Sequence, residues 1–217
     1  MTSFPHAIGS WRPAGGWQFG RLRGPCEETT ASSLVVLKFG GSLLSRPDWP
    51  TLLKTLLKTL AADRRPATCC LVVGGGAVVE GLRSLDRAVP QEARFMHALA
   101  IDAMRLTARL VAYALELPLV AAPPGDGTTA VLDVPAWLAV ASRADQLPAG
   151  WETTSDSIAA LVAATHSGRL LLAKSVPPLP CPGAVEPVSA LAEAGWVDPY
   201  CPAAAASLTA IAWAAPA

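Results

Sequence analysis

Short apolar runs alternate with longer segments of helical period along most of this chain. The runs are LVVLKF at 34–39, TCCLVV at 68–73, LPLVAA at 117–122, RLLLAKSV at 169–176 and SLTAIAWAA at 207–215. The segments between them that have the length and apolar spacing of amphipathic helices are 47–62, 77–88, 92–115 and 154–168. Because strands joined by helices form right-handed βαβ units, the sequence predicts an α/β domain with a mainly parallel sheet.

The composition predicts one domain that is preceded by an extension. Residues 1–32 are rich in Gly, Pro, Ser and Thr and show neither strand nor helix period, so we expect a mobile N-terminal extension. A length of 217 residues is typical of a single domain, which we place at 33–217. Within it, the PPGDGTT cluster at 123–129 is predicted to be a loop.

The charge balance argues against two classes of partner. Seventeen Lys and Arg residues balance 17 Asp and Glu residues, so no global field attracts nucleic acid or an anionic membrane, and a basic site has to be local. No uninterrupted run of 18 apolar residues predicts a membrane span. Since 52% of the residues are apolar and only 16% are charged, we expect a large core or an extensive interface in a homo-oligomer.

The cysteines and the N-terminus indicate a cellular compartment. The five cysteines are an odd number without a CxxC pair, which argues against both a secreted disulfide framework and a structural zinc site. The N-terminal residues lack the basic and apolar segments of a signal peptide. We therefore expect a cytoplasmic protein, and no His, Asp or Glu spacing predicts a dedicated metal site.

Glycines follow the first two strands at the edge where parallel sheets bind ligands. Gly40 and Gly41 follow 34–39, and three glycines at 74–76 follow 68–73. Glycine backbones allow N–H groups to converge on phosphate oxygens, and the helix after the triple glycine adds the positive end of its dipole. Neither cluster matches the Walker loop GxxxxGK[ST] or the dinucleotide motif GxGxxG. Lys38 precedes the first pair, either as a phosphate ligand or as a solvated strand-end lysine.

Four stretches, in this order, resemble the amino acid kinase family: KFGGSLL, LVVGGGAVVEGLR, TSDSIAALVA and LLLAKSV. That family includes acetylglutamate, carbamate, aspartate and uridylate kinases. The resemblance spans about 34–176, with a weaker similarity at WVDPY, residues 196–200. It implies a three-layer αβα sandwich with an acceptor-binding half at 33–150 and a shortened nucleotide-binding half at 151–217.

Within the family, WETTSDSIAA together with VDPY is most similar to the aminomethylfuran phosphate kinase group, which makes a diphosphate in the synthesis of methanofuran-type cofactors. The resemblance therefore implies an ATP-dependent small-molecule kinase whose acceptor is a phosphate monoester such as aminomethylfuran phosphate. Mg²⁺ would arrive with ATP, bridging its phosphates. Family members are often dimers or hexamers.

The resemblance also implies roles for individual residues. Lys38 would contact the transferred phosphoryl group, Asp156 would orient the lysines, and Lys174 would face the nucleotide phosphates. The remaining positions expected to bind the acceptor or its phosphate are Gly40, Gly41, Ser42, Gly74, Gly75, Gly76, Thr154 and Ser155. Asp102, on the helix at 92–115, is a further candidate for acceptor contact.

Alternatives remain open at the level of both residues and function. Asp156 stands at a helix start, where a plain N-cap is common, and Asp102 can instead pair with Arg105 on a solvated edge. Relatives continue after the last lysine with a glycine-containing nucleotide loop, whereas this chain has the proline-rich PPLPCPGAV at 177–185. The alternative functions are a non-catalytic binding or storage subunit of the same fold, and a kinase that acts on a carboxylate or carbamate.

Overall fold

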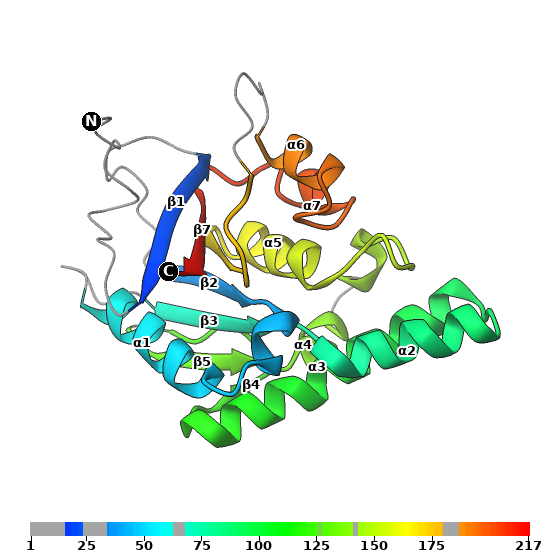
Figure 1. The fold of residues 1–217 in the computed structure, drawn as a ribbon, viewed down its shortest axis with the longest axis horizontal. Helices are drawn as coiled ribbons and strands as arrows, with labels where there is room; N and C mark the ends of the chain where they lie inside the picture. The colour runs from blue at the N-terminus through cyan, green and yellow to red at the C-terminus, as the bar shows by residue number, and fades with distance from the viewer. Residues whose placement is uncertain (1–15, 24–33, 63–67, 126, 141–142, 180–186) are drawn as a thin grey trace.

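A computed structural model describes residues 16–23, 34–62, 68–125, 127–140, 143–179 and 187–217 (Figure 1). In these ranges one sheet runs in the order β1-β7-β6-β2-β3-β5-β4, and every pairing is parallel except that of β1 with β7. The strands are β1 (Trp17–Arg23), β2 (Leu34–Phe39), β3 (Thr68–Val73), β4 (Leu119–Val120), β5 (Thr129–Leu132), β6 (Arg169–Ala173) and β7 (Ile211–Pro216).

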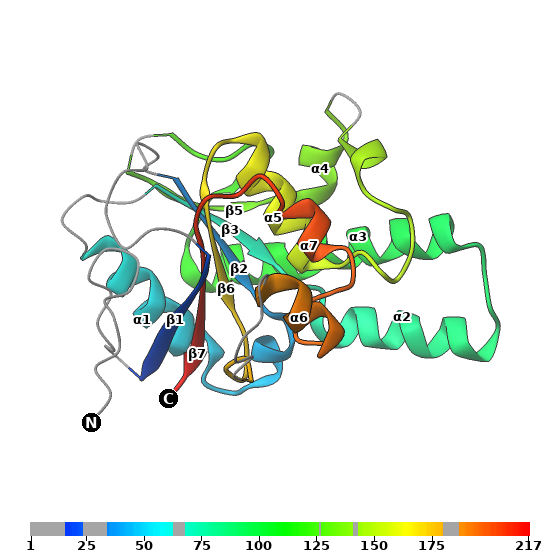
Figure 2. The ribbon, with the colours of Figure 1, turned by 90° about the horizontal axis from the view of Figure 1, so that it is seen from above.

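Helices cover both faces of the sheet, which confirms the three-layer αβα prediction. The α-helices are α1 (Trp49–Ala61), α2 (Gly76–Ala88), α3 (Ala93–Leu115), α4 (Val134–Leu138), α5 (Ser155–Thr165), α6 (Pro187–Glu193) and α7 (Cys201–Ala204). Helices α1 and α3 pack on one face, α5 to α7 lie over the other, and α2 extends beyond the strand ends (Figures 1 and 2). None of the helices in the described ranges is long and apolar enough to cross a membrane.

The alternation of side chains along β2 decides where its lysine lies. Val35, Leu37 and Phe39 belong to the core under α1 and α3, whereas Val36 belongs to the core under α5. Successive side chains of a strand point to opposite faces, so Lys38 shares the α5 face with Val36. The core therefore places this ammonium group under the start of α5.

Residues 17–23 are not part of a separate extension, contrary to the prediction for 1–32. They form β1, which pairs antiparallel with β7, while 1–15 and 24–33 lie outside the described residues. Trp17 is 1% exposed, and its indole Nε1 donates to the Leu52 carbonyl at 3.0 Å. A register shift between Arg21 and Arg23 interrupts the alternation of the strand, which explains why the sequence shows no strand period there.

The segment from 117 to 132 also differs from its prediction. The expected strand at 117–122 is reduced to the two residues of β4. In the sheet, β5 lies between β4 and β3, and it begins at Thr129, the last residue of the predicted loop. Four residues are too few to show a period, and this strand is specified by its pairing with β3. The helices α1, α2, α3 and α5 lie close to their predicted ranges.

Replacing Trp17 tests whether β1 belongs to the folded domain. Trp17→Ala removes a fully buried indole and its hydrogen bond, so we expect a loss of about 3–5 kcal/mol in the free energy of unfolding. Denaturant unfolding of the full chain measures this loss, with Gln18→Ala, a partly buried residue of the same strand, as the control. Equal stability of the two variants would show that β1 is not docked in solution.

Candidate active site

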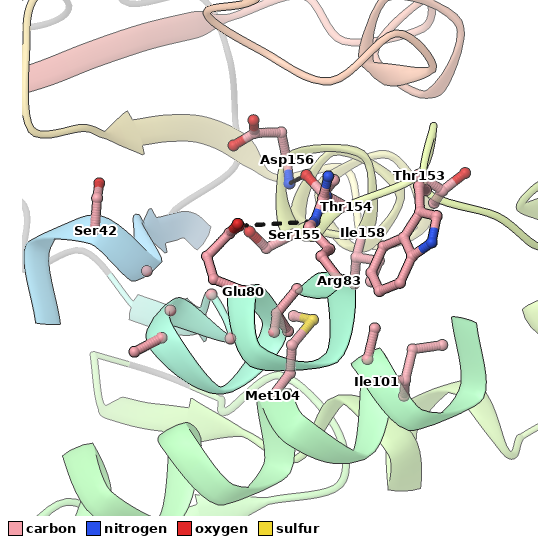
Figure 3. Close-up of a pocket in the computed structure, with 18 of the residues that line it drawn as sticks. Ser42, Glu80, Arg83, Ile101, Met104, Thr153, Thr154, Ser155, Asp156 and Ile158 are labelled. Carbon is pink, nitrogen blue, oxygen red and sulfur yellow. Dashed lines mark hydrogen bonds and ion pairs between the residues drawn. The ribbon is translucent and has the colours of Figure 1, made fainter. Parts of the chain in front are cut away.

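A cleft of about 570 Å³ lies beyond the carboxyl ends of β2, β3 and β6. Figure 3 shows it between the start of α5, which carries Thr154, Ser155 and Asp156, and the helices α2 and α3, which contribute Glu80 and Met104 from the opposite side. Its lining includes every residue that the sequence predicted for the site except Gly40 and Asp102. The edge of the sheet predicted from the glycine clusters is thus the edge that is hollowed.

The two glycine loops pack directly against each other at the floor of the cleft. A Cβ on Gly41 would lie 2.3 Å from the backbone nitrogen of Gly76, so only glycine permits this approach. Gly76 itself has a φ of 55°, a conformation that other residues rarely adopt. Helix α2 starts here, and no described side chain caps its first turn, so its amides remain available to an anion.

Two lysines share one buried carboxylate at the other wall of the cleft. Lys38 Nζ lies 2.9 Å from Asp156 Oδ1, and Lys174 Nζ lies 2.6 Å from Oδ2. The side chains of Lys38 and Asp156 are each 5% exposed, and that of Lys174 is 15% exposed. Two ammonium groups against one carboxylate leave a net positive charge out of contact with bulk water. The arrangement therefore favours a bound anion.

The titration of this triad follows from burial and charge together. Burial alone would raise the pKa of the Asp156 carboxyl, but the charges and hydrogen bonds of Lys38 and Lys174 outweigh it and hold the pKa below its usual range. Burial, and then the charge of Lys38, lower the pKa of Lys174 to about 8, against the opposing effect of Asp156. At neutral pH the carboxylate is ionised and occupied by lysines, which makes it unsuited to act as a general base.

Asp156 is not the cap of its helix. Thr154 is the N-cap of α5, and its hydroxyl accepts from the Asp156 backbone N–H at 3.4 Å. Asp198 accepts from the Thr154 backbone N–H at 3.0 Å and from its hydroxyl at 2.7 Å. With the helix start satisfied by these groups, the Asp156 side chain is free to pair with the lysines. The plain N-cap alternative is therefore wrong.

The far side of the cleft carries groups that the sequence did not single out. The Arg83 guanidinium lies over the Trp151 ring at 4.6 Å, and the Trp151 Nε1 donates to Asp86 at 2.7 Å. Glu80 lies 3.6 Å from Arg83 Nε, and the Thr153 hydroxyl is buried without a hydrogen-bond partner in the described part of the chain. Ile101 and Met104 of α3 supply an apolar wall.

Two predicted site residues lie away from the cleft lining. Asp102 is exposed on α3, and Arg105, its expected partner, pairs instead with Asp133 at 2.9 Å. The structure therefore does not bring Asp102 to the site. Gly40 lies behind the lining, where its N–H donates to the Ala173 carbonyl at 2.9 Å and joins the end of β2 to β6.

Comparison with known proteins agrees with this geometry. The amino acid kinase family matches residues 33–179, more than half of the chain. The chain belongs to the amino acid kinase family. As a member of this family it is a phosphotransferase that acts on small molecules. No curated protein matches the full sequence significantly.

Solved kinase structures share the fold. Uridylate kinase from Archaeoglobus fulgidus superposes with a TM-score of 0.52 at 16% identity, covering 82% of this chain and 99% of that one. Aspartate kinase from Synechocystis superposes with a TM-score of 0.53 at 16% identity, covering 84% of this chain but only 40% of that one. At this identity the similarity concerns the αβα architecture alone.

The residues of the cleft suit phosphate oxygens better than a directly bound metal ion. Two buried ammonium groups and uncapped helix amides are donors to phosphate oxygens. Among the described residues, no group of three or more His, Cys, Asp or Glu side chains is placed to hold a metal ion. Asp156, which lines the cleft, already has a lysine at each of its oxygens.

Removing the shared carboxylate tests whether the triad forms in solution. Asp156→Ala leaves two buried ammonium groups without a counterion, so we expect a loss of about 3–5 kcal/mol in the free energy of unfolding. Asp48→Ala is the matched control, because it removes a 2.8 Å pair with Arg46 whose side chains are roughly half exposed. Thermal unfolding should separate the two variants clearly. Similar melting temperatures would rule out the buried triad.

Proposed function

We propose that this chain is an ATP-dependent kinase that transfers the γ-phosphoryl group to a phosphate monoester. The observation that carries the proposal is the buried Lys38–Asp156–Lys174 triad, which leaves a net positive charge beside the uncapped amides of α2. Phosphoryl transfer requires positioning and fixed positive charge more than covalent help from the protein. The cleft offers both and has no general base at its centre.

The proposed reaction transfers the γ-phosphoryl group of ATP to an oxygen of the acceptor phosphate. An oxygen of the acceptor phosphate bonds to the γ-phosphorus while the bond from that phosphorus to the β,γ-bridging oxygen breaks, and ADP leaves with the electron pair. A phosphate monoester is already anionic, so its attacking oxygen needs no proton acceptor. Lys38 stabilises the charge on the transferred group, Lys174 binds the nucleotide phosphates, and Asp156 holds both ammonium groups in place.

In this proposal Mg²⁺ would bind together with ATP and not at a separate protein site. The Mg²⁺ ion, coordinated by the phosphates, would neutralise part of their charge. The residues that would receive the phosphates of ATP are Lys38, Gly41, Ser42 and Lys174, which all line the cleft. The proline-rich segment lies partly outside the described residues, since 180–186 are not described.

A small cyclic acceptor such as aminomethylfuran phosphate suits the acceptor side of the cleft. Its phosphate would lie at the triple glycine, and a flat ring would contact the apolar wall of Ile101 and Met104. The Glu80 carboxylate, which lines the same cleft, is available to a protonated amine. The motifs at 151–160 and 197–200 support the same acceptor through their resemblance to the aminomethylfuran phosphate kinase group.

An ADP-release assay with a panel of acceptors tests the proposal. Wild-type protein should release ADP with a phosphate monoester. Lys38→Ala should lower turnover at least about a hundredfold, because the substitution removes the positive charge that would stabilise the transferred phosphoryl group. Lys54→Ala, an exposed lysine of α1, is the control and should retain full turnover. Faster turnover with a carboxylate or carbamate would show that the acceptor is not a phosphate monoester. Failure to bind millimolar ATP in calorimetry would favour a binding or storage subunit.

We also infer that the enzyme is a cytoplasmic homo-oligomer. Cys69, Cys70 and Cys201 are buried free thiols, as a reducing compartment allows. Helix α3 exposes a stripe of apolar side chains at helical spacing, in which Leu106, Leu110 and Tyr113 are 56%, 52% and 87% exposed. A second copy would remove this stripe from water.

Light scattering tests the association. The wild-type chain should have at least twice the mass of one chain, and Leu106→Glu should reduce this mass by placing a charge in the apolar stripe. Lys54→Glu, on the exposed side of α1, is the control for added charge. A monomeric wild-type protein at micromolar concentration would contradict the inference.

A further inference from the structure

A three-residue segment far along the chain contacts Lys174 and the first turn of the helix that carries Asp156. The segment is Trp196–Asp198, which lies between α6 and α7 and outside the part that matches the kinase family. Trp196 contacts the lysine, and Asp198 contacts the helix that carries the aspartate.

Asp198 occupies the start of α5 with both carboxylate oxygens. Oδ2 accepts from the Thr154 N–H and hydroxyl, and also from the Ser157 N–H at 3.0 Å, while Oδ1 accepts from the Ser157 hydroxyl. Asp198 is 6% exposed and Ser157 is fully buried, so these bonds form away from water. A carboxylate is also favoured by the positive end of the helix dipole. The first turn of α5 is thereby fixed against the α6–α7 connection.

The direction of the Asp156 side chain depends on this anchor. Thr154 and Ser157 are three residues apart and share one side of the first turn, while Asp156 projects from another side. Holding the first side against Asp198 therefore turns Asp156 toward the lysines. A rotation of the turn by a small angle would move the carboxylate away from both ammonium groups.

Trp196 completes the arrangement at the lysine. Its carbonyl accepts from Lys174 Nζ at 2.7 Å, and its ring lies 5.1 Å from the same nitrogen. The Trp196 Nε1 donates to the Val176 carbonyl at 3.1 Å, which ties the segment to the chain that follows the lysine. The Lys174 ammonium group is thus held by the Asp156 carboxylate and by the carbonyl and ring of Trp196.

We propose that Trp196–Asp198 is the positioning element of the phosphoryl-transfer site, with Asp198 as its principal positioning residue. The proposal rests on the proposed function, because it assigns the segment to the geometry of the Lys38–Asp156–Lys174 triad. It predicts that loss of the Asp198 carboxylate lowers turnover without removing any residue of the cleft lining.

The first test is kinetic. Asp198→Asn should lower kcat at least about tenfold, because a displaced charge loses much of its effect, while KM for the acceptor changes less than about twofold. Asp133→Asn is the matched control, since Asp133 caps α4 and pairs with Arg105 outside the cleft, and its kcat should equal that of wild type. Ser157→Ala, which removes one bond to Asp198, is the milder variant if Asp198→Asn fails to fold.

The second test reads the geometry without activity. The chain has only four lysines, so ¹³C-labelled lysine NMR of the full chain resolves the titration of Lys174, assigned with Lys174→Arg. The titratable groups that act on Lys174 are Lys38 on β2, Asp156 on α5 and Cys201 on α7. Asp198→Asn should lower the pKa of Lys174 below its wild-type value, because the displaced Asp156 no longer raises it.

Failure of the positioning role and failure of the proposed function give different results. A wild-type titration of Lys174 in Asp198→Asn, together with a kcat equal to that of Asp133→Asn, would overturn the positioning role. Absence of phosphoryl transfer by the wild-type chain with every acceptor would overturn the proposed function. In that case a lowered pKa of Lys174 in Asp198→Asn would still support the geometric role of the segment.

Discussion

The carboxylate of Asp156, shared by two buried ammonium groups, is the interaction on which the site depends. Lys38 and Lys174 are both nearly enclosed by protein, and neither charge would be tolerated there without a counterion. Because one carboxylate serves two lysines, the triad remains positive. In the proposed function a phosphate group supplies the missing negative charge, so the same interaction would link the stability of the domain to its chemistry.

The parallel sheet brings these three residues together from distant parts of the chain. β2 and β6 are neighbours in register, with Lys38 opposite Leu172, so Lys174 follows two residues later toward the same face. Helix α5 covers this face and begins at the same edge, where its first turn presents Asp156. The crossover topology thus places each charge at the carboxyl ends of the strands.

Much of this arrangement could be predicted from local patterns. The apolar runs identified β2, β3, β6 and β7, and the glycines identified the ligand-binding edge. The rest depends on contacts between distant residues. β1 could not be predicted from its own residues, because Gly20 interrupts its apolar pattern and a register shift breaks the strand period. The strand is specified by its pairing with β7, where Gly20 packs under Trp213. Asp102 has the same chemistry as a site residue, but its position on α3 faces solvent.

The acceptor side and the anchor of α5 show the same limit. Arg83 of α2 and Trp151, which precedes α5, are distant in sequence, and only the tertiary fold brings the guanidinium over the ring. Asp198 lies in a stretch that the sequence marked as similar to relatives, yet its four hydrogen bonds to the start of α5 follow from tertiary structure alone. Local patterns identify strands and helices, whereas the polar network is determined by how they pack.

Binding of MgATP, followed by NMR of the four ¹³C-labelled lysines, tests most directly whether the Lys38–Asp156–Lys174 triad receives phosphates. We expect the signals of Lys38 and Lys174 to change with nucleotide concentration, while those of Lys54 and Lys58 on the exposed side of α1 stay constant. If millimolar MgATP leaves the signals of Lys38 and Lys174 unchanged, the buried triad does not receive the phosphates of the nucleotide, and its proposed role is wrong.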